Sequence, residues 1–187
     1  MSRAYRLHLA ESLRRHLVVA DGITTQLELL PVLPEVQLAA LLQAELEAQG
    51  FQGAGDRWRQ RLASGVELSI DPRDGSVHLG LQREREVAVE RTLDTTVDEE
   101  FKEAARQRLG EQLRLAMARE IDGQQRELQG QVTRALAAEL AEVRGELDRL
   151  AHRVTAAALK LKASQLGTVE TVEDDEANGA LTLRVRL

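Results

Sequence analysis

The sequence contains no cysteine. Disulfide bonds, a thiol nucleophile and a cysteine-based zinc site are therefore excluded. Aromatic residues make up 2% of the 187 residues, so few side chains are available to stack on bases or sugars. The formal net charge is −6, whereas proteins that bind nucleic acids generally carry a basic field. We therefore expect a protein that does not bind nucleic acid.

Long apolar runs are absent as well. No stretch approaches the roughly 18 apolar residues of a membrane-spanning helix. Residues 1–15 carry scattered charges in place of the apolar segment of a secretory signal. We expect a cytoplasmic protein without membrane contact. Hydrophobic residues nevertheless form 43% of the chain, which suffices for a core built mainly from Leu, Val and Ala.

Residues 1–94 carry the two-residue alternation of apolar and polar side chains that is typical of half-buried β-strands. The alternation starts at Tyr5 and continues to Val19, as one bent strand or as two strands. An Ala-Asp-Gly turn signal at 20–22 predicts that a second strand, over about 23–30, returns beside the first.

A short helix is predicted at about 34–49. Pro34 suits the first turn of a helix, where its missing N–H costs nothing. Leucines at three- and four-residue steps then form an apolar stripe. Gly50 is suited to end the helix as its C′ residue, with Phe51 making the accompanying hydrophobic contact.

An antiparallel hairpin is predicted next. Two alternating runs, 66–70 and 77–81, flank an Asp-Pro-Arg-Asp-Gly tight turn. A short strand near Trp58 precedes them, after a loop at 53–56. The alternation resumes beyond the hairpin, so its last strand either continues through the charged residues 83–86 or ends there in a loop.

The stretch 95–166 has no proline and is apolar at helical spacing, which predicts a long helix. Thr96 and Glu99 have the form of a capping box, and Gly167 is suited to end the helix. The weakest segment is 122–130, because each glycine in a helix interior costs about 1 kcal/mol relative to alanine. A break there would give a helical hairpin that buries its own apolar stripes. An unbroken helix would need a second chain to cover them. We favour a long helix or helix pair that relies on a partner, and the hairpin stays open.

The second half of this stretch has the heptad spacing of a coiled-coil seam. From Val97 to Ile121 the apolar residues are instead mostly four positions apart. Their stripe therefore drifts around the helix axis, which suits packing on a sheet. We take the seam as the candidate interaction surface. Its residues are Leu136, Leu140, Val143, Leu147, Leu150, Val154 and Leu161.

The last stretch, 167–187, predicts a β-hairpin. Leu181, Leu183 and Val185 alternate with polar residues, and an acidic turn ends in the Asn-Gly signal at 178–179. Two strands alone are marginal in water, so we expect this hairpin to pack on the helix or to join the N-terminal sheet. The predicted fold class is therefore α+β, with an antiparallel sheet, one short helix, a long helix or helical hairpin, and a C-terminal β-hairpin. The three parts are 1–94, 95–166 and 167–187.

No catalytic, cofactor or metal motif stands out. The acidic run 173–176 lacks the alternating ligand spacing of an EF-hand, and neither a P-loop nor a Gly-x-Ser-x-Gly sequence occurs. The histidines show no metal-ligand spacing, so we interpret them as surface or core residues: His8, His16, His78 and His152. We expect no cofactor, no metal and no enzymatic activity.

Both ends of the chain resemble a known family. The residues that carry the resemblance are 2–6, 21–22, 25–30, 33–34, 50–51, 161–163, 166–167, 169, 172–174 and 179–183. They resemble small accessory proteins encoded beside bacterial AAA+ ATPases in the FtsH or MoxR–von Willebrand ternary systems, which are proposed NTP-dependent conflict systems. The resemblance implies a role beside such an ATPase and offers no functional residues to transfer.

Two functional hypotheses follow. The first is a non-enzymatic adaptor or scaffold, which presents its long helix to a second copy or to a protein partner such as an AAA+ ATPase system component. The second is a regulator that binds a small ligand or metal, or an unrecognised enzyme, with a pocket between sheet and helix that includes His78 or His152. A phage-like structural subunit is a third.

Overall fold

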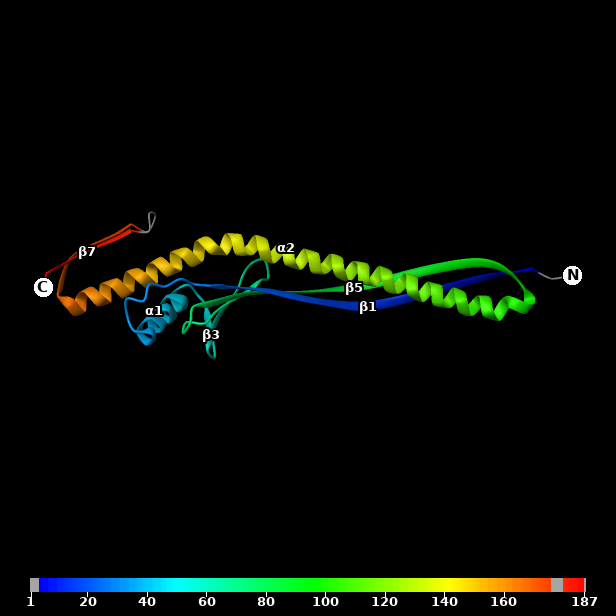
Figure 1. Cartoon of the computed structure of the whole chain (residues 1–187), viewed down its shortest axis with the longest axis horizontal. Coiled ribbons are helices and arrows are strands. Elements are labelled where there is room, and N and C mark those ends of the chain that lie inside the picture. The colour runs from blue at the N-terminus through cyan, green and yellow to red at the C-terminus, as the bar shows by residue number, and fades with distance from the viewer. Residues whose placement is uncertain (1–3, 176–179, 187) are drawn as a thin grey trace. The chain divides into compact units, whose positions relative to one another are not determined.

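The computed structural model of the chain describes residues 4–175 and 180–186. Its elements are β1 (Ala4–Gln26), α1 (Glu35–Ala48), β2 (Gln52–Ala54), β3 (Arg57–Arg61), β4 (Glu67–Ile70), β5 (Ser76–Asp98), a 3-10 turn (Glu99–Phe101), α2 (Lys102–Leu166), β6 (Thr168–Asp175) and β7 (Ala180–Arg186) (Figure 1). The predicted α+β class is confirmed, with a five-stranded antiparallel sheet, a short helix, a long helix and a C-terminal hairpin.

The five strands follow the order β1-β5-β4-β3-β2 in one sheet. The predicted hairpin is confirmed, because β4 pairs antiparallel with β5 from Glu67 opposite Gly80 to Ile70 opposite Val77. β2 was expected to be part of a loop. It instead pairs with β3, with Gly53 opposite Trp58.

The turn predicted at 20–22 is wrong, because β1 is a single strand of 23 residues that runs through it. A glycine is needed at position 22 because another side chain lies close to it, and not because the chain turns there. A Cβ atom at this position would lie 2.6 Å from Cε1 of His78 on β5. Asp21 is held by Thr133, whose hydroxyl donates a hydrogen bond of 2.7 Å to Oδ2 of the aspartate. Both residues thus serve long-range contacts that the local sequence does not reveal.

The capping box predicted at Thr96 is wrong for a similar reason. β5 continues through the charged residues 83–86 to Asp98, so Thr96 lies in a strand. The 3-10 turn Glu99–Phe101 then leads into α2, and Asp98 makes no side-chain capping bond. The hydroxyl of Tyr5 on β1 donates a hydrogen bond of 3.0 Å to Glu99 in this turn.

α2 is a single helix of 65 residues, and 122–130 is helical throughout, so the chain does not form a helical hairpin. Ile121, Val132, Val143 and Val154 recur every eleven residues and are 0%, 1%, 3% and 1% exposed. Three turns of an α-helix take about 10.8 residues, so this row stays on one face of the helix. Continuous burial along the row opposes the helix-breaking tendency of the glycines.

The structure packs as two compact units. Unit 1 comprises the described residues of Met1–Ala20 and Gln82–Val132, and unit 2 those of Asp21–Leu81 and Thr133–Leu187. β1, β5 and α2 each contribute residues to both units, so the units combine pieces of the three stretches expected from the sequence. The buried core of unit 1 consists of Leu17, Val19, Val87, Val89, Leu113, Met117, Ile121, Leu128 and Val132.

In unit 2, α1 lies within one residue of its predicted bounds and ends as predicted. Gly50 has a φ of +84°, and its N–H bonds to the carbonyl of Glu47 at 3.0 Å. The N–H of Phe51 bonds to the carbonyl of Leu46 at 3.0 Å, which completes a Schellman motif. The segment that enters α1 and the helix itself pack on α2, where Leu33 and Leu38 form a buried cluster with Ala158.

β6 and β7 form a separate two-stranded sheet, so the hairpin does not join the five-stranded one. A bulge interrupts the register between Val169 and Thr171. As a result Val169 and Val172, three residues apart, lie opposite Val185 and Leu183 on the same face. The predicted Asn-Gly turn lies outside the described residues.

Candidate functional site

The seven predicted interaction residues lie on α2 in unit 2, and the chain itself covers most of them. Buried residues, 0% to 7% exposed, are Leu136, Val143, Leu147, Leu150 and Val154. Leu140 is half-buried and Leu161 is 39% exposed. Five of the seven side chains are thus part of the core of the single chain. Contact of this seam with a second protein stays a prediction, for which Leu161 offers the most accessible side chain of the seven.

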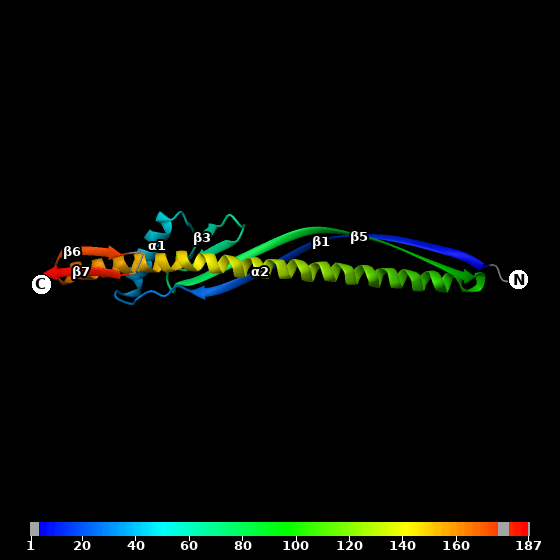
Figure 2. The same cartoon turned by 90° about the horizontal axis from the view of Figure 1, so that it is seen from above.

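A second candidate surface lies in unit 1, where β1 and β5 form a two-stranded ribbon alongside α2 (Figures 1 and 2). Odd-numbered residues of the ribbon face the helix. Glu11 pairs with Arg114 at 3.7 Å, and Arg91 donates to Glu120 from its Nε atom at 3.0 Å. Arg85 likewise donates to Gln131 at 3.1 Å. The even-numbered residues of 4–20 and 82–98 form the opposite face, which we call the outer face.

The outer face carries charges of opposite sign in two parallel rows. The basic row on β1 consists of Arg6, His8, Arg14 and His16, and the acidic row on β5 consists of Glu84, Glu86, Glu90 and Asp94. All eight residues are exposed. Nδ1 of His8 lies 2.6 Å from Oδ1 of Asp94, and Nε2 of His16 lies 3.3 Å from Oε2 of Glu84. An exposed ion pair contributes about 0–1 kcal/mol, and a histidine forms one only when it is protonated, so the rows matter more as a surface than as a source of stability.

The histidines take up two kinds of position. His8 and His16 lie on the outer face of unit 1. In unit 2, Nδ1 of His78 on β5 lies 3.3 Å from the hydroxyl of Thr24 on β1. His152 is half-buried on α2. Side chains alternate along β5, so His78 lies on the face opposite to that of the buried Val77 and Leu79. Among the described residues, no group of three or more His, Cys, Asp or Glu side chains could hold a metal ion.

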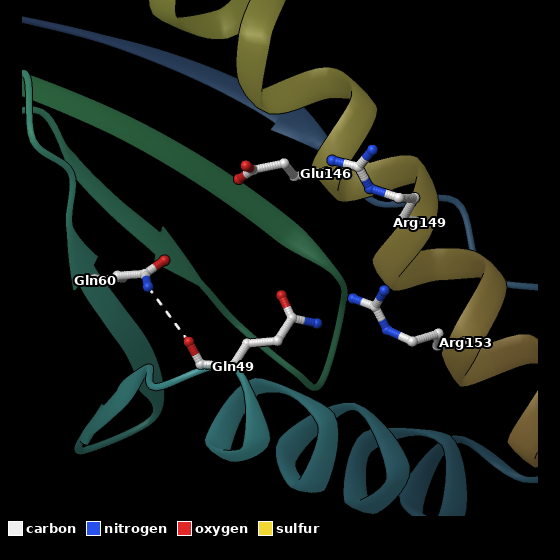
Figure 3. A pocket seen from close by; sticks show the side chains of 5 residues that line it. All are labelled: Gln49, Gln60, Glu146, Arg149 and Arg153. Carbon is white, nitrogen blue, oxygen red and sulfur yellow. Dashed lines mark hydrogen bonds between the residues drawn. The ribbon is translucent and has the colours of Figure 1, made fainter. Parts of the chain in front are cut away.

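A polar cleft of about 420 Å³ lies in unit 2 (Figure 3). Glu146, Arg149 and Arg153 line it from α2, Gln49 from the end of α1, and Gln60 from β3. Arg153 ties the two helices together, because its Nε atom lies 2.5 Å from Oε1 of Glu45 in the last turn of α1. Nε2 of Gln60 donates to the carbonyl of Gln49 at 3.4 Å. Two guanidinium groups in a polar cleft are suited to bind a small anion, which Glu146 opposes.

The tight turn between β4 and β5 contains a buried carboxylate. Asp71 is 6% exposed and accepts hydrogen bonds from Nε and Nη2 of Arg73 at 3.1 and 2.9 Å. The backbone N–H of Arg73 adds a third at 3.0 Å. These hydrogen bonds hold the pKa of Asp71 below its ordinary value, against the opposing effect of desolvation. The same contact raises the pKa of Arg73. The pair stabilises the turn.

The whole chain, residues 1–187, matches the family model described as FtsH ternary system domain X5. The chain belongs to this family. The resemblance seen at both ends of the sequence is confirmed. No curated protein and no solved structure matches the chain. Within the part of this FtsH ternary system domain that the structure describes, no helix is both long and apolar enough to cross a membrane.

Sequence reasoning missed both surfaces of this FtsH ternary system domain. The outer face joins residues that lie far apart in the sequence, such as His8 and Asp94, and the two rows become neighbours only when β1 pairs with β5. A signal was present, because the even positions of the two strands carry opposite charges. The α2 residues that line the cleft, Glu146, Arg149 and Arg153, are spaced three and four residues apart. In the sequence they look like the solvent-exposed charged residues that flank any coiled-coil seam, so no signal indicated a cleft.

Proposed function

We propose that this chain is a non-enzymatic adaptor or scaffold subunit of an FtsH ternary system and acts through protein–protein contacts. The observation that carries the proposal is the outer face of unit 1. A ribbon with α2 on one side presents two exposed rows of opposite charge on the other. Such complementary rows give specificity and orient a partner more than they add affinity.

The partner proposed is the AAA+ ATPase component of the same system. Glu86 and Glu90 lie in the middle of the acidic row, and both are exposed. We therefore expect the double variant Glu86→Lys/Glu90→Lys to weaken the complex at least tenfold. Glu111→Lys/Glu142→Lys changes the charge equally on exposed positions of α2 and serves as the matched control.

Binding is measured by titrating the purified chain against the purified ATPase in light scattering and calorimetry, at low and at high salt. A complex that is weakened by the β5 variant and left intact by the α2 variant supports the proposal. The chain alone is expected to hydrolyse no nucleotide. Failure to bind any component of the system, or equal loss of binding in both variants, contradicts it.

The polar cleft favours a second candidate, a regulator that binds a small anion. Arg149 is exposed on the cleft wall beside Gln49. Calorimetry with inorganic phosphate and with acetate tests this function, and Arg149→Gln is expected to abolish any heat of binding. Arg144→Gln, at another exposed position of α2, is the control. Absence of binding at millimolar anion removes this candidate.

A further inference from the structure

Four described strands have an edge that no other described strand covers: β1 and β2 at the two ends of the five-stranded sheet, and β6 and β7 in the two-stranded one. The two that matter here are β1 and β6. β1 lies at the end of the five-stranded sheet and has β5 as its neighbour. β6 belongs to a two-stranded sheet and has β7 as its neighbour. The open edge of a strand presents a row of unpaired backbone N–H and C=O groups, which can accept a strand from another chain. Because β1 is 23 residues long, its part in unit 1 offers ample length for the eight residues of β6.

The hairpin has two chemically different faces. Its polar face carries Glu173 and Asp175 on β6, and Arg184 and Arg186 on β7, all exposed. Its other face carries Val172 on β6, which is 44% exposed, and Leu181, Leu183 and Val185 on β7, and by register position 174 of β6 lies on it opposite Leu181. The strand β6 is therefore acidic on the polar face, and β7 is basic on it.

We propose that β6 of one copy adds to the open edge of β1 in unit 1 of a second copy. The resulting sheet has the order β7-β6-β1-β5. Its polar face then carries four rows of alternating charge: arginines on β7, carboxylates on β6, the basic row on β1 and the acidic row on β5. Opposite charges on neighbouring strands stabilise a sheet, and like charges destabilise it, by about 0.2–1 kcal/mol per pair.

The same charges disfavour two other pairings at this edge. Addition of β7 to β1 would place Arg184 and Arg186 beside the basic row. A twofold pairing of β1 with β1 of a second copy would place two basic rows side by side. Both arrangements bring like charges together on an exposed face, whereas β6 brings only opposite ones.

The apolar sides agree with this arrangement. Leu13 lies on the side of β1 that faces α2, yet it is 42% exposed. Over 171–175, beyond the bulge, side chains of β6 alternate with a period of two, so Val172 lies on this side whenever Glu173 and Asp175 face the basic row. Val172, exposed in the single chain, then lies on the same side of the sheet as Leu13. Strand addition thus buries apolar surface that the single chain leaves in water.

The contact joins two different surfaces, so each copy has one free donor hairpin and one free acceptor edge. Such heterologous contacts continue from copy to copy unless a rotation closes them into a ring. The proposal therefore states that the chain assembles head to tail with itself. It concerns the purified chain alone and does not depend on binding to an ATPase.

Sedimentation velocity of the full chain, over a range of protein concentrations and salt, tests the assembly. We expect oligomers that grow with concentration and shrink as salt screens the charges. Arg6→Glu/Arg14→Glu and Glu173→Lys/Asp175→Lys should each weaken association at least tenfold, and an equimolar mixture of the two variants should restore it. Arg108→Glu/Arg119→Glu, at exposed positions of α2, is the matched control and should associate like the wild type. A strict monomer, or a mixture that fails to restore association, overturns the proposal.

Disulfide trapping identifies the strands that meet, and the absence of native cysteine makes each cross-link unambiguous. Thr171→Cys on β6 is mixed with chains that carry Ala10→Cys, Ser12→Cys or Val18→Cys on the outer face of β1. A cross-link between these chains supports the proposal, because paired strands bring Cβ atoms within disulfide reach. In unit 1 the side of β5 away from β1 has no described neighbouring strand either, and addition of the basic β7 there would also bring opposite charges together. Thr92→Cys on β5 with Thr182→Cys on β7 tests this second edge. Cross-linking of that pair alone, or of Ala10→Cys with itself alone, overturns the proposal.

Discussion

At the scale of single residues, close packing decides which glycines matter. A Cβ atom at Gly167 would meet the carbonyl oxygen of Arg186 and lie 3.1 Å from Cγ1 of Val185, whereas Gly123 in α2 has nothing within 4 Å. We expect Gly167→Ala to destabilise the protein by about 1–3 kcal/mol through overpacking. Gly123→Ala should stabilise it by up to about 1 kcal/mol, since alanine favours a helix. Urea denaturation measures the change in the free energy of unfolding for both variants. Equal effects would show that close packing at Gly167 does not distinguish it from Gly123.

The hydrogen-bonded pair of Asp71 and Arg73 leads to a prediction of how stability depends on pH. Because the pKa of Asp71 is lowered in the folded state, its contribution to stability is complete above the unfolded pKa of about 3.9. The contribution is lost as the pH falls through the folded value. Asp71→Asn should therefore lower the free energy of unfolding by about 1 kcal/mol at pH 7, and the difference from wild type should shrink below about pH 4.

Thermal unfolding over pH 2–8 measures this difference. Asp148→Asn is the control, because it removes the same charge at an exposed position of α2 and leaves the Asp71–Arg73 hydrogen bonds in place. A constant difference between wild type and Asp71→Asn across this range would show that the carboxylate is not stabilised by its hydrogen bonds.

At the scale of elements, α2 has a buried face and an exposed face, as two of its leucines show. Leu113 is 1% exposed and Leu115 is 59% exposed, although both are leucines two positions apart on one helix. Leu113→Ala should lower the free energy of unfolding by about 2–5 kcal/mol, because it leaves a cavity in the core of unit 1. Leu115→Ala should change it by less than about 0.5 kcal/mol. Chemical denaturation of the two variants compares them directly, and similar losses would mean that this face of α2 is wrongly assigned.

The elements also show why local signals misled sequence analysis at some positions. The hydroxyl and acid of a capping box were present at Thr96, but strand pairing over β5 extended beyond them. The glycines at 122–130 suggested a break in the helix. However, the buried side chains that recur every eleven residues lie on both sides of this segment, and the helix continues through it. Where the signal depended on nearest neighbours alone, as in the Schellman end of α1 or the turn at Asp71, the prediction was right.

At the scale of the whole molecule, α2 supplies residues to both compact units without interruption. Helix formation is cooperative, so loss of structure in one half should spread to the other. The single tryptophan, Trp58, lies in unit 2 and reports on that unit by fluorescence, whereas circular dichroism reports on both. We expect Leu113→Ala in unit 1 to shift both unfolding midpoints together. Separate midpoints would show that the units unfold independently.

The sequence by itself determined the class of fold, the bounds of α1, the β4–β5 hairpin and the presence of a long helix. These follow from periodicity and from turn and cap residues within a few positions of each other. Only the tertiary structure decided that β1 and β5 run unbroken, that α2 is not interrupted at 122–130, and that five residues of the predicted seam are buried in the chain itself. It also brought the basic and acidic rows together. The physical reason is the same in each case: pairing and burial between residues about 50 to 130 positions apart outweigh local preferences of about 1 kcal/mol.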